Sequence, residues 1–178
     1  MIIKSTSIKD RTGVRRVVEY VFKEHKQHSL LYSRFLPRNA SIDTIVDCIE
    51  SNESKRIRRR KDSVILFHDM VSFHAGDSDK LQDEKVLRRI ARKYAKTRAG
   101  QSIAIIVAHQ DQAHIHLHCL LSGVQFDNGK SSRISQAEFQ KCKLEMERFQ
   151  EQELGLEKSR VDHRKKKSLY DLNQRCNQ

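Results

Sequence analysis

The sequence predicts a single α+β domain built on an antiparallel sheet with flanking helices. The chain has 178 residues, of which 37% are hydrophobic, so it is long enough for one domain with a real core. Segments with strand-like and helix-like patterns alternate along it. Two neighbouring strand-like segments, 101–109 and 114–126, are separated only by the polar residues QDQA. This tight break folds the second strand back beside the first, as in an antiparallel pair.

The first half of the chain alternates strand and helix. Residues 1–7 are predicted to form a strand, and 29–36, which is apolar, is also expected to be extended. Between them, 13–26 is predicted to be a helix, because its apolar side chains recur at helical spacing: Val14, Val17, Val18, Val21 and Phe22. Ser41 is a candidate N-cap for a second helix over 42–57.

The second half repeats the alternation. Residues 63–74 are rich in Val, Ile and Phe and predict a strand. A helix over 80–97 follows from the spacing of its apolar residues: Leu81, Val86, Leu87, Ile90, Ala91 and Tyr94. After the two strands described above, the DNG sequence at 127–129 indicates a turn. Ser135 is a candidate cap for a last helix that reaches about Leu154.

The charge of the chain points to a polyanionic partner. Lys and Arg number 35 against 23 Asp and Glu, for a net charge of +12. Two blocks, KRIRRRK at 55–61 and KSRVDHRKKK at 158–167, carry six cations each. Such blocks suit a nucleic acid, since every neutralised phosphate releases counterions. We expect DNA contacts from the first block: Arg56, Arg58, Arg59, Arg60 and Lys61.

Other features of the composition favour a cytoplasmic protein. The sequence has no apolar run near the roughly 20 residues of a membrane-spanning helix, and its first residues, MIIKSTSIKD, do not resemble a secretory signal. We therefore expect no membrane insertion. The cysteines are widely spaced, include no C-x-x-C pair and are interpreted as reduced thiols: Cys48, Cys119, Cys142 and Cys176.

Four histidines lie within the sequence HQDQAHIHLH at 109–118. Because alternate side chains of a strand share a face, His114, His116 and His118 point the same way. Residues two apart are separated by roughly 6.6–7 Å along a strand, so one metal ion takes a neighbouring pair, and either pair includes His116. His109, which ends the preceding strand, is folded back beside the pair as a third ligand.

Three imidazoles suit Zn, Ni, Cu or Mn by ligand type, and a three-histidine site leaves coordination positions open for catalysis. On a basic protein, such a metal would act on a phosphodiester. The nucleophile could be water or a side chain that forms a covalent intermediate. Tyrosine suits a reversible link to DNA, and the chain has four: Tyr20, Tyr32, Tyr94 and Tyr170.

The tyrosines differ in their surroundings. Tyr94 has the spacing of a core residue in its helix, and Tyr170 lies in the polar C-terminal segment. Tyr20 and Tyr32 are therefore the two candidates, and the residues alone do not choose between them.

The sequence HQDQAHIHLHCLL resembles the histidine signature of the HUH endonucleases and, more narrowly, the H-x-D-x-x-H-x-H-x-H pattern of relaxases, the mobilisation nucleases of plasmids and integrative elements. HDMVSFHAGDSD at 68–79 is similar to the segment that precedes the metal strands in that family. DNGK and the final QELGL resemble the family's segments after the metal strands, and VVEYVFKEHK at 17–26 is similar to its N-terminal tyrosine motif. The resemblance covers about residues 1–156.

The resemblance implies a five-stranded antiparallel sheet and assigns roles to individual residues. Tyr20 becomes the nucleophile, with Tyr32 as the alternative, and His109, His116 and His118 become the metal ligands. His114 is then a neighbouring group or an alternative ligand, and Asp111 matches the acidic position of the motif. The family's Asn after the histidine strand is replaced here by Ser122-Gly123.

We therefore expect a DNA relaxase that nicks and rejoins one strand through a 5′-phosphotyrosine intermediate and so starts mobilisation. Its cofactor would be a divalent cation, Mg²⁺ or Mn²⁺ in the cell, with Zn²⁺, Ni²⁺ or Co²⁺ as substitutes. Its partners would be DNA, single-stranded at the nick beside duplex or hairpin, and accessory mobilisation proteins. Residues 1–156 would form the nuclease domain, and 157–178 a basic extension or the start of a further region.

Two other functions fit the same residues. A rolling-circle replication initiator or transposase of the same superfamily would share the chemistry and differ in its DNA target. A nucleic-acid-binding module with a structural metal would need a fourth protein ligand that closes the site.

Overall fold

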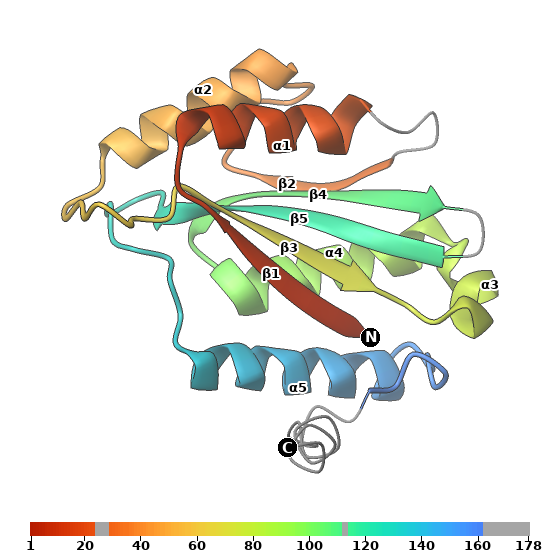
Figure 1. Ribbon diagram of the computed structural model, residues 1–178. Helices are drawn as coiled ribbons and strands as arrows, with labels where there is room; N and C mark the ends of the chain where they lie inside the picture. The colour runs from red at the N-terminus through yellow and green to blue at the C-terminus, as the bar shows by residue number, and fades with distance from the viewer. Residues whose placement is uncertain (24–28, 112–113, 162–178) are drawn as a thin grey trace, which may run out of the picture.

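The computed structural model describes residues 1–23, 29–111 and 114–161 and is organised around one five-stranded sheet (Figure 1). The order of strands across the sheet is β1-β3-β5-β4-β2, and all neighbouring pairs are antiparallel. The strands are β1 (Ile2–Ile8), β2 (Ser29–Arg34), β3 (Leu66–Ser72), β4 (Ser102–Asp111) and β5 (His114–Gln125). The predicted α+β class with a five-stranded antiparallel sheet is confirmed.

Helices cover both faces of the sheet. In Figure 1, two helices, α1 (Arg11–Lys23) and α2 (Ile42–Ser54), lie above the sheet, and two others, α4 (Glu84–Ala99) and α5 (Gln136–Gln152), lie below it. The short helices η1 (Ala75–Asp77) and α3 (Ser78–Leu81) connect β3 to α4. The molecule is thus a three-layer sandwich with two apolar cores, one on each side of the sheet.

Burial on both faces explains why the sequence of strand β4 is apolar almost throughout. Ile103, Ile105 and Val107 pack in the core under α1 and α2. Ala104 and Ile106 pack in the opposite core with α4 and α5. A strand that is buried on both faces loses the polar alternation of a surface strand, and this burial fixes which face each neighbouring strand presents.

Two helix starts agree with the predicted caps. The Ser41 hydroxyl accepts the Thr44 backbone N–H at the start of α2. Ser135 and Glu138 form a reciprocal capping box at the start of α5. The helix predicted over 80–97 differs, because it is divided into α3 and α4. The Asp83 carboxylate accepts the Lys85 N–H and so begins a new helix there.

The face of the sheet under α1 can be followed across the strands through their register. His116 on β5 pairs with His109 on β4 and with Ser72 on β3, and Ser72 pairs with Ile2 on β1. Directly opposite residues of an antiparallel sheet share a face. This row lies at the end of the sheet near the last turn of α1 (Figure 1).

Gly123, the residue after Ser122 in β5, lies so close to the backbone of Val64 that no side chain fits there. A Cβ atom at this position would lie 1.8 Å from the Val64 carbonyl oxygen. The Gly123 N–H donates to the Ile65 carbonyl at 2.8 Å. Ser122 is fully buried, and its hydroxyl accepts from the Asn52 side chain of α2 at 3.0 Å. The Ser-Gly pair therefore joins β5 to the segment before β3 and to α2.

The segment after α5 returns to the domain. Ser159 is 2% exposed, and its N–H donates to Asp77 at 2.6 Å. Its hydroxyl accepts the His74 N–H at 3.0 Å. Residues 157–161 are thus part of the packed structure, beyond the predicted boundary at 156, whereas most of the basic block at 158–167 lies outside the described residues.

The remaining compositional predictions concern thiols and membranes. Cys48, Cys119 and Cys142 are free thiols, in agreement with the reduced interpretation, and Cys176 lies outside the described residues. Within the described part of the chain, no helix is long and apolar enough to cross a membrane.

Candidate metal centre and nucleophile

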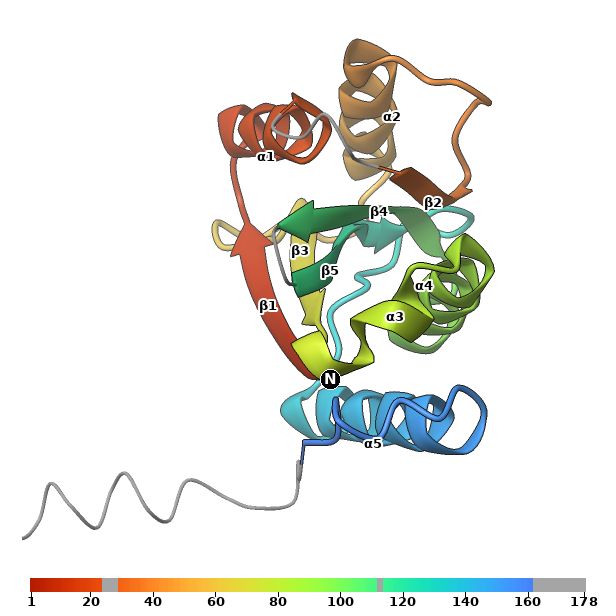
Figure 2. The same cartoon turned by 90° about the vertical axis from the view of Figure 1, so that its right-hand side faces the viewer.

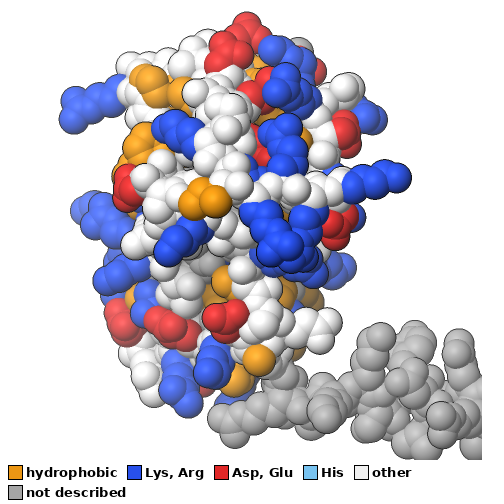
Figure 3. Space-filling model, turned by 90° about the vertical axis from the view of Figure 1, so that its left-hand side faces the viewer, with side chains coloured by type: hydrophobic (Ala, Val, Ile, Leu, Met, Phe, Trp, Pro, Cys, Tyr) orange, Lys and Arg blue, Asp and Glu red, His pale blue; other side chains and the backbone are white. Residues whose placement is uncertain are grey.

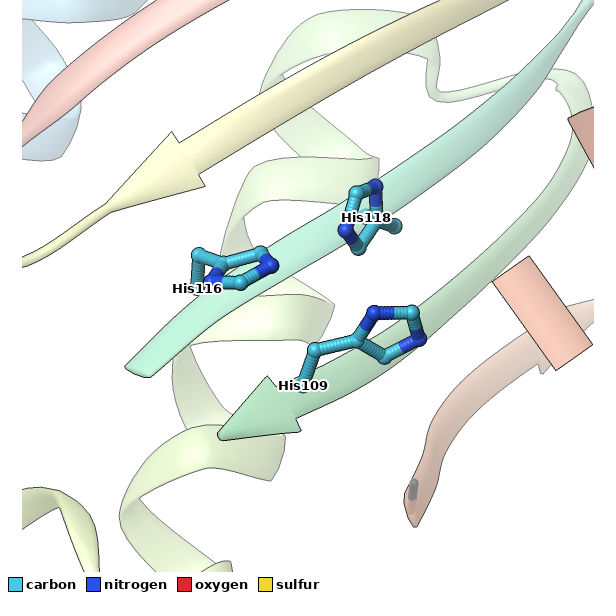
Figure 4. A group of neighbouring side chains, drawn as sticks. All are labelled: His109, His116 and His118. Atoms are coloured by element: carbon cyan, nitrogen blue, oxygen red, sulfur yellow. The ribbon is translucent and has the colours of Figure 1, made fainter. Parts of the chain in front are cut away.

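Three histidines converge at the end of the two central strands (Figure 4). His109 comes from β4, and His116 and His118 come from β5; one ring nitrogen of each lies within 4.8 Å of the others. The ring centroids of His109 and His118 are 4.3 Å apart, and those of His116 and His118 are 4.9 Å apart. His109 and His118 are fully buried, and His116 is partly exposed. The predicted triad is therefore assembled.

Hydrogen bonds orient two of these rings. The His109 Nε2 lies 2.8 Å from the Val21 carbonyl oxygen of α1. Since a carbonyl only accepts, Nε2 carries the proton and Nδ1 the lone pair. The His118 Nδ1 lies 2.8 Å from His68 Nε2. When His118 donates this bond, its Nε2 has the lone pair that a metal requires.

His68 on β3 contacts the triad, although its position in the sequence does not mark it as a site residue. Its ring stacks on His118 at a centroid distance of 5.0 Å. Burial lowers the pKa of His68, against the opposing charge of Asp69. The lowered pKa favours the neutral ring, which is the form able to accept from His118. The signal in the sequence is slight: His68 is one of two histidines in HDMVSFH and lies 50 positions from its partner His118.

Replacing His68 with alanine should weaken Mn²⁺ binding about 10–100-fold, because His118 loses the acceptor that sets its tautomer and ring orientation. The Gln variant should lose less, since its amide oxygen can also accept. Calorimetric titration with Mn²⁺ measures both variants. His74→Gln serves as the histidine control and should bind Mn²⁺ like the wild type. Equal Mn²⁺ affinity in His68→Ala and the wild type would remove His68 from the site.

The Tyr20 side chain lies against the triad. Its ring centroid is 5.5 Å from that of His118, edge to face, and 6.5 Å from that of His109. Its exposed fraction is 37%, so the ring is both close to the histidines and open to solvent. The preceding turns of α1 are anchored by Val14 and Val18, which are buried in the core above the sheet. An amphipathic helix thus holds the phenol of Tyr20 beside the histidines.

The other tyrosines lie elsewhere. Tyr32 pairs with Ile106 and packs in the core under α4 and α5, which is the opposite face of the sheet from the histidines. Its prediction as the alternative nucleophile is therefore not supported, because the sheet separates it from the triad. Tyr94 is fully buried, as predicted, and donates to Asp69 at 2.8 Å. Burial raises its pKa well above the ordinary value, with Asp69 adding to the effect. Tyr170 lies outside the described residues.

For two predicted site residues, Asp111 and His114, the structure describes the backbone but not the side chain. Asp111 and His114 face each other at the last register position of the β4–β5 pair. Their backbones belong to the strands, but their side chains lie outside the described part of the structure. Their roles stay predictions.

The basic block at 55–61 is not uniform. Arg56 is turned inward: its Nε and Nη2 donate to the two carboxylate oxygens of Glu53, each at 2.7 Å. It also donates to the Val64 carbonyl at 2.6 Å, and its side chain is 5% exposed. The prediction of a DNA contact from Arg56 is wrong, because this guanidinium is committed to a buried ion pair. The other four cations of the predicted set are exposed: Arg58, Arg59, Arg60 and Lys61.

The donor set fits a divalent transition metal. Three imidazole nitrogens converge, and two of the three rings have a second hydrogen bond of the kind that metal-binding histidines make. Among the described side chains, no other group of three or more potential ligands comes as close together. Three protein ligands leave room for a substrate oxygen. An open three-histidine site on this antiparallel sheet has the arrangement of a catalytic metal centre and not of a closed structural one.

Comparison with known proteins gives the family. The family model described as relaxase, MobA/VirD2-like, nuclease domain, matches residues 20–156. The chain belongs to this relaxase family. No curated protein is significantly similar to the chain in sequence.

Solved structures show the same fold. The MobM relaxase domain (MOBV; Mob_Pre) bound to plasmid pMV158 oriT DNA, in a Mn-bound crystal at pH 5.5, superposes with a TM-score of 0.66 at 17% identity, over 98% of each chain. A second MobM complex, at pH 6.8 and with a 3′-thiophosphate, gives 0.63 at 18% identity, over 98% of this chain and 97% of that one. A structure concerned with vancomycin resistance transfer in Staphylococcus aureus gives 0.55 at 17% identity, over 90% and 95%.

Proposed function

We propose that this relaxase nicks one strand of DNA at a specific site and rejoins it through a covalent tyrosine intermediate, and that this reaction starts the transfer of a plasmid or integrative element. The observation that carries the proposal is the position of Tyr20, whose ring lies 5.5 Å from that of His118. A phenol beside a histidine triad has both a nucleophilic oxygen and a place for the phosphate that it attacks.

A divalent cation bound by His109, His116 and His118 would supply Lewis-acid polarisation of the scissile phosphate. Mn²⁺ or Mg²⁺ is proposed, since the MobM complexes are Mn-bound and Mn²⁺ accepts imidazole as well as oxygen ligands. Zn²⁺, Ni²⁺ or Co²⁺ would fit the same nitrogen donors.

Tyr20 would attack the phosphorus through its phenol oxygen. A bond between this oxygen and phosphorus forms, the bond from phosphorus to the 3′ oxygen breaks, and the departing strand leaves with a 3′-hydroxyl. The phenol proton goes to a base, for which we propose Asp111 or a histidine that is not a metal ligand, such as His114. Rejoining is the reverse reaction, because the phosphotyrosine conserves the bond energy.

A basic track leads away from Tyr20. A groove of about 620 Å³ between β1 and α1 is lined by Tyr20, Arg16 and Lys9, among others. Lys9 also lines a second cavity of about 450 Å³, together with Arg60 and Lys61. Figure 3 views this end of the molecule and shows Lys and Arg gathered to the right of centre. The track supports a DNA strand that passes from the nick along β1 to the exposed part of the basic block.

The triple variant Lys9→Ala, Arg16→Ala and Arg60→Ala should bind single-stranded DNA with a flatter salt dependence. The slope of log K against log salt should fall by about 0.7 for each phosphate that the variant no longer neutralises. Fluorescence anisotropy across a salt series measures it. Arg92, Lys96 and Lys141 are exposed on α4 and α5, so their triple replacement by Ala makes the same charge change on the other face. Equal slopes for the two triple variants would argue against the track.

The other functions considered from the sequence are less well supported. A replication initiator or transposase would share the chemistry, but the family model that matches is that of relaxases. A closed structural metal site would need a fourth ligand, and the described cluster consists of three histidines.

The cellular setting is inferred from the proposed substrate. We propose that the protein acts in the cytoplasm, where plasmid DNA lies, with accessory mobilisation proteins at a nick site that adjoins duplex or hairpin DNA. Residues 157–178 would form a basic C-terminal extension or begin a further region.

The direct test is a covalent adduct. The protein is incubated with a pool of single-stranded oligonucleotides and Mn²⁺ or Mg²⁺, and the products are separated under denaturing conditions. A labelled DNA band that migrates with the protein is expected, together with fragments that end in a 3′-hydroxyl. Cleaved DNA without an adduct would point to water as the nucleophile, and intact DNA throughout would contradict the proposal.

A further inference from the structure

The row of residues across the sheet continues past the metal ligands onto an exposed apolar side chain. From His109 and His116, the row passes Ser72 and reaches Ile2 on the outer strand β1. Ile2 is 49% exposed, which makes it one of the few large apolar side chains of the described surface left open to solvent. The small Ser72 between Ile2 and His116 leaves a depression beside the metal ligand.

This depression is part of a cavity of about 420 Å³. Ile2 contributes apolar surface and His116 lines the cavity on the side of the metal centre, while Phe73, which is 5% exposed, closes it from the opposite core. Lys158 and Arg160 place cations around the cavity, and the Arg160 Nε pairs with Glu151 at 3.1 Å. Cavities of roughly 300–1,000 Å³ are typical of sites for small organic groups. A nucleotide has a base with apolar faces and an anionic phosphate. The apolar part of this cavity suits the base, and its cationic rim, beside the histidine triad, suits the phosphate.

The wall opposite the sheet is firmly built. It comes from the segment after α5, which lies beside the start of β1 and α3 in both Figure 1 and Figure 2. Ser159 anchors it: its N–H donates to Asp77, which is itself buried, and its hydroxyl accepts the His74 N–H. The two neighbours of Ser159 in sequence, Lys158 and Arg160, are thereby held at the cavity while their own side chains stay exposed.

We propose that this cavity holds the base of a nucleotide next to the scissile phosphate and thereby contributes to the choice of nick site. The inference rests on the proposed nicking function, because it takes the scissile phosphate to lie at the histidine triad. A base packed on the exposed side chain of Ile2 leaves water for an apolar surface. The adjoining phosphate meets the ammonium group of Lys158, which can form a charge-assisted hydrogen bond with it.

The experiment starts from DNA that the protein itself selects. Wild-type protein with Mn²⁺ is incubated with a pool of random single-stranded oligonucleotides, the covalent adducts are isolated, and their DNA is sequenced. The selected oligonucleotide is then made with an abasic residue at each of the two positions that flank the nick. Loss of the base at one of these positions should slow adduct formation by roughly 5- to 10-fold, as expected when about 40–55 Å² of apolar surface is no longer buried against Ile2.

The proposal is tested by whether the effect of removing the base depends on Ile2. In Ile2→Ala the abasic penalty should shrink by at least about twofold, as expected when two contacting groups are removed in turn, while Mn²⁺ affinity stays at the wild-type value. Leu30→Ala is the matched control. Leu30 is an aliphatic residue of similar exposure, 42%, on the other outer strand, and its loss should leave the penalty unchanged.

Each remaining outcome has a distinct meaning. Equal abasic penalties in the wild type and Ile2→Ala, or no penalty at either flanking position, would overturn the cavity assignment and leave the nicking function intact. Failure of the wild type to form any adduct would overturn both. Lys158→Ala changes only an exposed rim side chain, so it provides a second reading that does not depend on the folding of β1. On unmodified DNA, Lys158→Ala should form less adduct than the wild type. On DNA with a neutral methylphosphonate beside the nick, the difference between the variant and the wild type should be smaller, because the charge that Lys158 contacts is gone. An equal difference on both DNAs would count against the cavity.

Discussion

Replacing Tyr20 with phenylalanine should abolish both the protein–DNA adduct and cleavage while DNA binding persists. The change removes one oxygen and keeps the ring that packs edge to face on His118, so the fold and the metal site should survive. A phenol has an ordinary pKa near 10 and needs an ordered site to react at neutral pH. Denaturing electrophoresis detects the adduct, and anisotropy measures binding in the same samples.

The control for this variant is Tyr32→Phe. Tyr32 packs on the far face of the sheet, so this variant should cleave and form the adduct at the wild-type rate. Cleavage retained in Tyr20→Phe together with loss of activity in Tyr32→Phe would transfer the nucleophile to β2 and contradict the geometry. Activity in both variants would make the enzyme a hydrolytic nuclease.

His116→Ala should abolish cleavage and leave the fold nearly intact. His116 is the partly exposed member of the triad, so its truncation leaves little buried cavity while it removes one of three metal ligands. Calorimetry should show a loss of Mn²⁺ affinity, and circular dichroism should show an unchanged melting profile in metal-free buffer. The loss of activity should exceed about a thousandfold, since the Lewis acid no longer acts on the phosphate.

Two further variants test which histidines bind the metal. His118→Ala should be nearly as severe as His116→Ala, and it should also lower stability, because His118 is fully buried. His114→Ala should be milder. If His114→Ala were inactive and His118→Ala active, the metal would be bound by the other pair of neighbouring histidines.

The sheet and the triad could be predicted because their signals are local. The period of two in His114–His118 is a property of any strand, and the QDQA break brings His109 back to the same row. Tyr20 and Tyr32 could not be separated in this way. The face that Tyr32 occupies depends on its register with β4, and that register shifts between Leu30 and Tyr32. A one-residue slip exchanges the two faces of a strand.

Contacts between distant segments account for the features that the sequence did not reveal. His68 orients His118 across two adjacent strands, and nothing near His68 in the sequence marks it as different from other histidines. The composition of the segment groups Arg56 with its cationic neighbours, whereas its position one turn after Glu53 directs it inward. Composition reports that a segment is basic, whereas packing determines which of its charges reach a ligand.

The bond between His109 and Val21 has an energetic consequence. The last four carbonyls of a helix have no partner within the helix, and Val21 lies in that final turn of α1. The imidazole of His109 therefore acts as the C-terminal cap of the helix that carries Tyr20. The same hydrogen bond stabilises this helix end and sets the tautomer of a metal ligand. The unfolding of the last turn of α1 and the binding of the metal are therefore thermodynamically coupled. Removal of His109 would loosen the helix end that holds Tyr20 and weaken metal binding, and the two losses in free energy would not add as independent terms.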